Sequence, residues 1–310
     1  MIYLIMFIFL LFVILSCLSF YFFRLAILRG KTPFIVGDVN LKKDPSLKKL
    51  IEADQTWWDN QPFSCWSLTS RDGLNLHAYY LPAKNQTNKT VVLAHGYACD
   101  AQIMKEFARL YHEEFNFNIL VPDARGHGRS EGMFIGFGWK ERIDYLDWLA
   151  MIIKNCGAGS DILLHGVSMG AATVMMVSGE QLPEQVIAII ADCGYTSVKE
   201  QLAYQLKRLY RLPAFPLIYT TSFVSKWLAG YSFNEASPLK QVKKATIPIM
   251  FIHGDQDAFV PTEMVHRLYQ ACSAEKRLVI IEGAGHGLAN RVNPAKYKEE
   301  LLGFLMRYGI

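Results

Sequence analysis

The chain has 310 residues, of which 51% are hydrophobic and 19% charged, and this composition excludes a mainly disordered protein. The net charge of +4 is too small to indicate a nucleic-acid-binding protein, and no RNA-binding motif is present. The six cysteines are scattered without a C-x-x-C pair, so the sequence predicts neither a zinc site nor a disulfide framework.

Residues 1–23 contain no charged side chain and are almost wholly apolar. As a helix they span about 34 Å, enough to cross the hydrocarbon core of a bilayer. A secretory signal peptide needs a positively charged start, and no such residue precedes Arg24. The absence of a positively charged start also argues against a lipoprotein site at Cys17. We therefore predict a transmembrane anchor that is retained in the mature protein.

Residues 24–60 are predicted to be a polar connector with a short helix around residues 47–57. By the positive-inside rule, basic residues after the anchor predict a single-pass protein of the cell membrane with its body in the cytoplasm. An outward-facing body remains the alternative. The basic residues are Arg24, Arg29, Lys31, Lys42 and Lys43.

Residues 61–310 are predicted to form one domain. Two strands, 63–69 and 74–81, flank the turn Arg71-Asp72-Gly73 and indicate a hairpin. From Thr90 onward strands alternate with helices, which is typical of a doubly wound, mostly parallel α/β sheet. The predicted strands cover 91–94, 118–121, 162–164, 186–191, 249–252 and 278–281, and the predicted helices cover 103–112, 139–154, 261–271 and 294–308.

An insertion at about residues 194–242 interrupts this alternation. It has helical propensity, many aromatic residues and five basic ones, and its place between two strands predicts a cap over the strand ends. We hypothesise that this cap admits acyl chains or lipid-like esters from the membrane side. The alternative is that its aromatics pack onto the sheet and its basic residues form a solvated face. The basic residues are Lys199, Lys207, Arg208, Arg211 and Lys226.

The central motif is Gly166-Val-Ser-Met-Gly170, between an apolar strand and an apolar helix. A glycine on each side lets the strand and the helix approach closely around a sharp turn that exposes Ser168. The N-terminus of the helix directs free backbone N–H groups to the same point. A glycine-rich turn that merely carries a serine is the alternative interpretation.

A serine nucleophile needs an imidazole base, which in turn needs a carboxylate. Strand 249–252 leads into His253-Gly-Asp-Gln-Asp257, and strand 278–281 leads into Gly285-His286-Gly287. The order serine, acid, histidine is that of α/β-hydrolases. We therefore predict a triad of Ser168, Asp257 and His286, with Asp192, after the strand 186–191, as the alternative acid.

From about Thr90 to its end, the chain resembles the α/β-hydrolase superfamily. It is most similar to bacterial membrane-anchored serine hydrolases related to serine aminopeptidase and to acylaminoacyl-peptidase-like esterases. The resemblance implies Asp257 rather than Asp255 as the acid, and an oxyanion hole formed by the backbone N–H groups of Tyr97 and Met169. The matching segments are His95-Gly96, 123–130, 166–170, 253–261 and 285–287.

The expected function is hydrolysis of a small ester or lipid-like substrate through an acyl-enzyme on Ser168. An aminopeptidase or amidase of the same fold is the first alternative. A catalytically silent binding protein is the second, because a fold alone does not guarantee an activity. No cofactor or metal is needed by this mechanism, and none is predicted. His95, His127 and His165 are interpreted as hydrogen-bonded scaffold residues.

Overall fold

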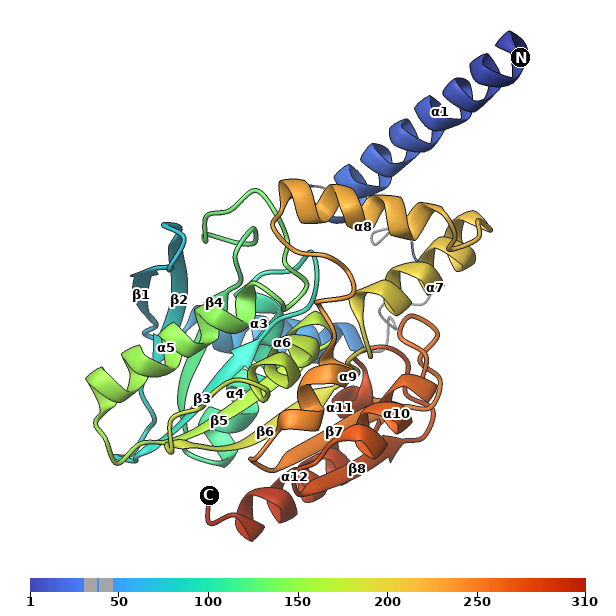
Figure 1. The fold of residues 1–310 in the computed structure, drawn as a ribbon. Helices are drawn as coiled ribbons and strands as arrows, with labels where there is room; N and C mark the ends of the chain where they lie inside the picture. Colours follow the sequence, from blue (N-terminus) through green and yellow to red (C-terminus); the bar gives the residue numbers. More distant parts are fainter. Residues whose placement is uncertain (31–37, 39–46) are drawn as a thin grey trace.

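The computed structural model describes residues 1–30, Asp38 and residues 47–310 (Figure 1). Its strands are β1 (Ser64–Thr69), β2 (Asn75–Leu81), β3 (Lys89–Ala94), β4 (Asn118–Asp123), β5 (Asp161–Val167), β6 (Val186–Asp192), β7 (Ile249–Gly254) and β8 (Lys276–Ile281). They form one eight-stranded sheet in the order β1-β2-β4-β3-β5-β6-β7-β8. β2 is antiparallel to β1 and to β4, and all other neighbours are parallel. The predicted doubly wound, mostly parallel sheet is confirmed.

Helices cover both faces of this sheet. One face packs against α3, α4 and α12, and the other packs against α5, α6 and α10. The helical segments are α1 (Ile2–Ala26), α3 (Lys48–Asp59), η3 (Ala101–Met104), α4 (Lys105–Glu114), α5 (Glu141–Cys156), α6 (Met169–Val177), α7 (Val198–Tyr210), α8 (Leu217–Leu228), α9 (Pro238–Gln241), η4 (Val242–Lys244), α10 (Glu263–Ala271), α11 (Ala289–Val292) and α12 (Pro294–Arg307).

The central strand β5 shows why the sequence folds this way. Ile162, Leu163 and Leu164 are fully buried, because helices cover both faces of a parallel sheet and successive side chains point to opposite faces. Leu163 belongs to the core on one face, and its two neighbours belong to the core on the other. The parallel strands all end at one edge, so the loops after β3, β5, β6, β7 and β8 meet there.

Two helix boundaries differ from the predictions for a local reason. The segment predicted as one helix over 103–112 begins with the 3₁₀ turn η3, in which the side chain of Asp100 accepts a hydrogen bond from the backbone N–H of Gln102. The helix predicted from residue 139 begins at Glu141, whose carboxylate accepts the N–H groups of Gly136 and Gly138 at 2.8 Å. The first is a cap and the second ties the preceding loop to the helix, and hydrophobic periodicity encodes neither.

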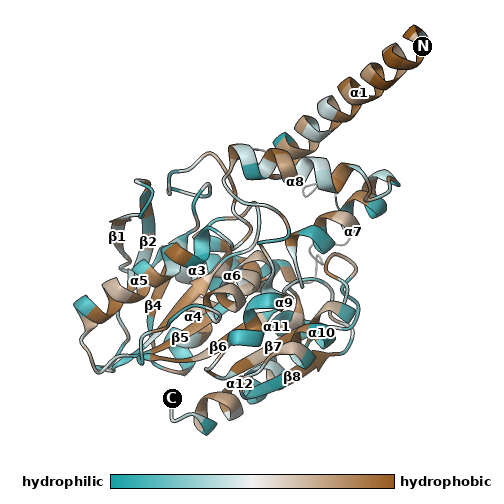
Figure 2. Cartoon of the chain, viewed as in Figure 1, coloured by the Kyte–Doolittle hydropathy of each residue, from teal (hydrophilic) through white to brown (hydrophobic). Residues whose placement is uncertain are grey.

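α1 is long and apolar enough to cross a membrane, and Figure 2 shows it mostly hydrophobic where it stands away from the body. It continues three residues beyond the predicted end at residue 23. Its base is buried: Ser19, Phe23 and Ile27 are 1%, 3% and 0% exposed. Of the basic residues used for the predicted orientation, Lys31, Lys42 and Lys43 lie outside the described residues.

The insertion between β6 and β7 forms α7, α8 and α9, and it joins α1 to the rest of the molecule. A third hydrophobic cluster contains Phe23 and Ile27, the loop after β4, and apolar residues of α6, α7 and α8. α7 also holds the loop after β7, because Gln201 and Gln205 each donate to the carbonyl of Phe259, at 2.9 and 2.8 Å. The insertion therefore braces one of the loops that meet at the strand ends.

Candidate active site

The turn from β5 into α6 has the geometry of a strained nucleophile elbow. Ser168 adopts φ 58° and ψ −115°, a conformation that costs a non-glycine residue free energy. The close approach of the flanking strand and helix requires glycine at two positions. A Cβ at Gly166 would overlap the carbonyl of Gly170, and a Cβ at Gly170 would overlap the carbonyl of Ala94 at the end of β3. The motif therefore fixes a close packing of β3, β5 and α6 around the serine.

Replacement of Gly170 by alanine is expected to lower the free energy of unfolding by about 3 kcal/mol or more, because backbone must move to admit the methyl group. Gly303 in α12 is the matched control, since nothing lies within 4 Å of its Cβ position. Gly303→Ala is expected to stabilise the protein by up to about 1 kcal/mol through helix propensity. Chemical denaturation measures both. Equal effects of the two substitutions would contradict the packing described for the elbow.

Three predicted residues meet above the sheet edge. The Oγ of Ser168 lies 2.8 Å from Nε2 of His286, and Nδ1 of His286 lies 2.7 Å from Oδ2 of Asp257. The side chains come from the ends of β5, β8 and β7 respectively. Asp257 is buried, whereas Ser168 and His286 are partly exposed. The arrangement allows a proton to pass from the serine to an imidazole that a carboxylate orients.

Asp257 is held ionised by its surroundings. Burial alone favours the neutral acid, but interactions with His286 and His253 outweigh burial and hold the pKa of Asp257 well below its usual range. Its Oδ1 accepts the N–H groups of Phe259 and Val260, at 2.9 and 2.8 Å. His253 is a contributor that the sequence analysis left without a role: its Nε2 lies 3.1 Å from Oδ2 and 2.9 Å from the carbonyl of Val260.

The alternative acids lie elsewhere. Asp255 accepts the N–H of Gly283 at 2.7 Å on the surface. Asp192 is fully buried and its Oδ2 accepts the hydroxyl of Tyr297 at 3.0 Å, with no hydrogen bond to His286. Burial raises the pKa of Asp192 to about 6. Asp192 therefore belongs to a buried network beneath the elbow, which also contains His165 and Tyr111.

The two residues expected to form an oxyanion hole flank the serine. Met169 is the first residue of α6, where a helix has no intrahelical acceptor for its N–H. The loop before Tyr97 lies against the serine, since a Cβ built at Gly96 is 3.6 Å from the Cβ of Ser168. The hydroxyl of Tyr97 points away and donates to the carbonyl of Ala26 in α1 at 2.8 Å, while its ring stacks on Phe137.

Comparison with known proteins agrees with this architecture. The profile of the alpha/beta hydrolase family matches residues 91–299. The chain belongs to this family. It is 31% identical to the uncharacterized protein YqkD of Bacillus subtilis over 77% of each chain. It is 22% identical to protein bem46 of Schizosaccharomyces pombe over 70% of this chain and 68% of the relative.

Solved structures show the same fold. The esterase Pf2001 of Pyrococcus furiosus matches with a TM-score of 0.65 and 23% identity over 86% of this chain and 97% of that chain. The acylaminoacyl peptidase of Pyrococcus horikoshii matches with a TM-score of 0.61 and 16% identity, over 82% of this chain and 43% of that chain. The protein therefore has the same fold as these two enzymes.

The other histidines of the hydrolase near the site serve as hydrogen-bond partners of the backbone or of the core. Nε2 of His95 accepts the N–H of Ala124 at 2.9 Å, and Nε2 of His127 accepts the N–H of Ala98 at 3.2 Å. His165 lies between the hydroxyls of two buried tyrosines, and burial lowers its pKa to about 3. None of the three contacts the triad by a hydrogen bond, which agrees with their interpretation as scaffold residues.

A cleft of about 390 Å³ opens in front of Ser168. Its described lining is largely apolar, and it also includes three charged residues, Lys105, Glu106 and Arg291. None of the lining residues that the structure describes comes from the insertion at 194–242, so the aromatics of that segment do not line the cleft. The apolar lining residues include Leu47, Ile51, Ile103, Met104, Phe107, Phe259 and Leu288.

One group of neighbouring side chains consists of residue types that commonly bind metal ions. Within the described chain, Cys193, Asp257 and His286 place one potential ligand atom each within 4.8 Å of the others. Burial, together with the charges of Asp192 and Asp257, raises the pKa of the Cys193 thiol. A neutral thiol is a poor metal ligand, and His286 and Asp257 already bind each other. The donor set therefore suits a triad better than a metal ion.

Proposed function

We propose that this hydrolase cleaves carboxylic esters through an acyl-enzyme on Ser168. The observation that carries the proposal is the continuous pair of hydrogen bonds from the serine through His286 to Asp257, at 2.8 and 2.7 Å. A serine in a strained elbow, within reach of an oriented imidazole, is the arrangement that activates a hydroxyl as a nucleophile.

The first half of the reaction forms the acyl-enzyme. Nε2 of His286 takes the proton of Ser168 as Oγ attacks the carbonyl carbon of the ester. The negative oxygen of the tetrahedral intermediate is stabilised by the backbone N–H groups of Tyr97 and Met169. As the intermediate collapses, His286 returns its proton to the departing alcohol, and the acyl group remains on the serine.

The second half releases the acid. A water molecule gives a proton to Nε2 of His286 and attacks the acyl carbon. The same N–H groups stabilise the second intermediate, and the proton returns to Oγ of Ser168 as the carboxylic acid leaves. Asp257 remains ionised throughout, since its role is to orient the imidazole and to stabilise the positive charge that the imidazole gains.

Two features of the cleft favour esters with an apolar acyl group over substrates of an aminopeptidase. The described lining of the cleft is largely apolar, which suits an acyl chain. An aminopeptidase needs an acceptor for the charged amine of its substrate. Glu106 is the one carboxylate among the described lining residues, and it forms an ion pair with Arg291. No carboxylate of the described cleft is thus left to bind an amine.

The ester preference is tested by comparing leaving groups on one acyl chain. We expect purified full-length protein to hydrolyse a short p-nitrophenyl ester at least about 100-fold faster, in kcat/KM, than the matching p-nitroanilide or an aminoacyl anilide. Faster turnover of the aminoacyl anilide would assign the protein to the aminopeptidase alternative. Turnover of neither substrate, by a protein that also fails to react with a fluorophosphonate, would favour a silent binding protein.

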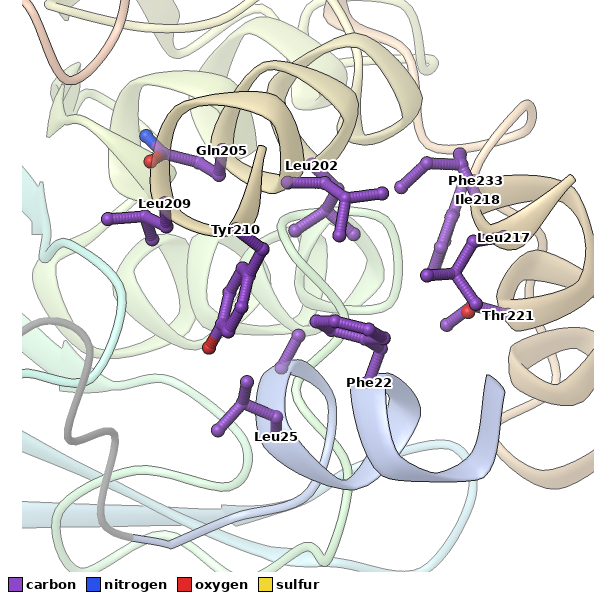
Figure 3. A pocket seen from close by; sticks show the side chains of 12 residues that line it. Phe22, Leu25, Leu202, Gln205, Leu209, Tyr210, Leu217, Ile218, Thr221 and Phe233 are labelled. Carbon is purple, nitrogen blue, oxygen red and sulfur yellow. The ribbon is translucent and has the colours of Figure 1, made fainter. Parts of the chain in front are cut away.

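We further propose that α1 is a retained membrane anchor of a single-pass protein, with the body on the cytoplasmic side. The base of α1 supports retention, because it is part of the folded body. Figure 3 shows Phe22 and Leu25 pointing towards the side chains of α7 and α8 around a narrow apolar cavity of about 50 Å³. The chain after α1 continues this packing: the N–H of Ile135 donates to the carbonyl of Ile27 at 2.8 Å. Cleavage of a signal peptide at the end of α1 would remove the contacts of Phe22 and Leu25.

A matched pair of substitutions within α1 tests this integration. Phe23 is 3% exposed and Phe12 is 66% exposed. In detergent micelles, Phe23→Ala is expected to lower the free energy of unfolding by about 3 kcal/mol, and Phe12→Ala by less than about 0.5 kcal/mol. Intact mass spectrometry of protein taken from membranes is expected to find residues 2–26 present. A mature chain that begins after residue 26 would refute the anchor.

A further inference from the structure

α8 carries a row of aromatic side chains on its outer face. Tyr219, Phe223 and Trp227 follow one another at intervals of four residues and so lie along one side of the helix. Phe215, just before the helix, extends the row, because its ring centroid lies 5.8 Å from that of Tyr219. In chain order, the exposed fractions of the four are 72%, 49%, 75% and 74%. The opposite side of α8 is buried against the body. A contiguous row of large exposed aromatics indicates an interaction surface rather than a solvated one.

This aromatic row lies at the foot of α1. The hydroxyl of Ser19 in α1 donates to Oγ1 of Thr220 in α8 at 2.7 Å, and the ring of Phe22 packs edge-on against Tyr210 with centroids 5.1 Å apart. Figure 1 shows α8 lying across the base of α1, where α1 leaves the body. The two apolar surfaces are therefore neighbours.

The length of α1 before this contact indicates the depth at which α8 lies relative to the bilayer. At about 1.5 Å per residue, the part of α1 before Ser19 spans about 26 Å, close to the roughly 30 Å thickness of a bilayer hydrocarbon core. If α1 spans the bilayer, the boundary of the hydrocarbon core falls near Ser19. α8 touches α1 at that residue and so lies at the level of the headgroups.

The chemistry around the row suits that level. Aromatic side chains such as Trp and Tyr are enriched at membrane interfaces, where one part of the ring is apolar and another is wet. A basic residue contacts the row, since the ammonium of Lys199 lies 4.3 Å from the centre of the Tyr219 ring, and Lys207 and Arg211 of the same insertion are exposed. Arg208 and Lys226 do not take part, because they form ion pairs with Asp38 and Glu235.

We propose that α8 is an interfacial helix that lies in the headgroup layer of the bilayer that α1 crosses, with Phe223 and Trp227 inserted among the lipids. This inference rests on the proposed anchoring by α1. A bilayer suits the surface better than a soluble partner does, since any such partner would have to occupy the space directly beside the membrane-spanning part of α1. With two attachment points, the body is held in a fixed orientation on the membrane.

Trp227 provides a selective probe, because α1 contains no tryptophan and each of the other five is at least partly buried. Full-length protein is reconstituted into phosphatidylcholine vesicles with and without bromine on the acyl chains, and tryptophan emission is recorded. We expect brominated lipid to quench part of the emission, and this quenched part to be lost in Trp227→Phe. That variant keeps an aromatic ring but removes the indole.

A charge on the row tests the insertion itself. Phe223→Asp is expected to remove most of the quenching of Trp227, because a carboxylate is expelled from the lipid. Met306→Asp in α12 is the matched control, since Met306 is also strongly exposed, at 68%, but lies on a helix that packs on the sheet. It is expected to leave the quenching unchanged. The unfolding midpoints of both variants show whether the fold is kept.

The outcomes separate this inference from the anchor. Protein that floats with the vesicles but shows the same quenching in wild type and Trp227→Phe retains the anchor and overturns the interfacial helix. Protein that does not float overturns the anchor and the inference with it. If Trp227 is instead shielded by a second copy of the chain, its emission in detergent will shift to shorter wavelength with rising protein concentration, and that result also overturns the inference.

Discussion

Asp257→Asn is expected to lower kcat about 10⁴-fold, the loss seen when the imidazole of a serine triad is left in the wrong tautomer. Asp257 accepts from Nδ1 of His286 at 2.7 Å, and an amide that turns its NH₂ towards Nδ1 would stabilise the other tautomer. That tautomer carries its hydrogen on Nε2 and cannot take the proton of Ser168. The measurement is the rate of ester hydrolysis at saturating substrate.

Asp192→Asn is the matched control for this substitution. It makes the same chemical change at the alternative acid, which is bonded to Tyr297 rather than to His286. We expect it to retain kcat within about tenfold of the wild-type value, because no hydrogen bond of the triad is altered. If Asp192→Asn were the more damaging of the two, the acid would have to be reassigned to the end of β6.

The substitution Asp192→Asn is also expected to change how the free energy of unfolding depends on pH. Burial raises the pKa of Asp192 to about 6 in the folded protein, above the value of about 3.9 in an unfolded chain. The folded state therefore holds the proton more tightly, and Asp192 costs stability as pH rises from about 4 through 6. Asp192→Asn removes this cost. Its stability relative to wild type is expected to improve between about pH 4 and pH 6 and to change little above pH 6, as followed by thermal unfolding.

The parts of the site that could be predicted are those with local signals. Ser168 lies in a five-residue motif whose two glycines are required by contacts within the same turn. His286 and Asp257 each follow a short apolar strand, and parallel strands bring such positions to one edge. The chain order then separated the triad from the other histidines. Strand identities were predictable for the same reason, since buried parallel strands are short continuous apolar runs.

Contacts between distant segments were not predictable. The bond from the hydroxyl of Tyr97 to the carbonyl of Ala26 joins residues that are 71 positions apart, and no local pattern encodes it. Likewise, the spacing of the aromatics in the insertion is the same whether they pack over the cleft or elsewhere, so the spacing could not predict where they lie. The structure places α8 against α1, and the described lining of the cleft includes Leu47 and Ile51 near the start of α3 instead. His253 belongs to the segment 253–261, which carries part of the family resemblance. Its contact with Oδ2 of Asp257 could not be predicted, because that contact depends on the path of the loop after β7.

Ser168→Ala is expected to lower kcat by about 10⁶-fold, because the nucleophile and its proton are both removed. His286 loses its partner at 2.8 Å, while the packing of the elbow is unaffected by the loss of one oxygen atom. The variant is therefore expected to fold and to reach the membrane like the wild-type protein. A loss of activity without a loss of protein separates a chemical role for Ser168 from a structural one.

Covalent labelling by a fluorophosphonate tests the central claim most directly. The reagent reacts with a serine only when a base takes its proton and the developing oxyanion is stabilised. Wild-type protein is expected to gain the mass of one phosphonyl group, located by peptide sequencing at Ser168, and Ser168→Ala is expected to gain none. A wild-type protein that stays unlabelled, or a label that survives Ser168→Ala, would contradict the assignment of Ser168 as the nucleophile.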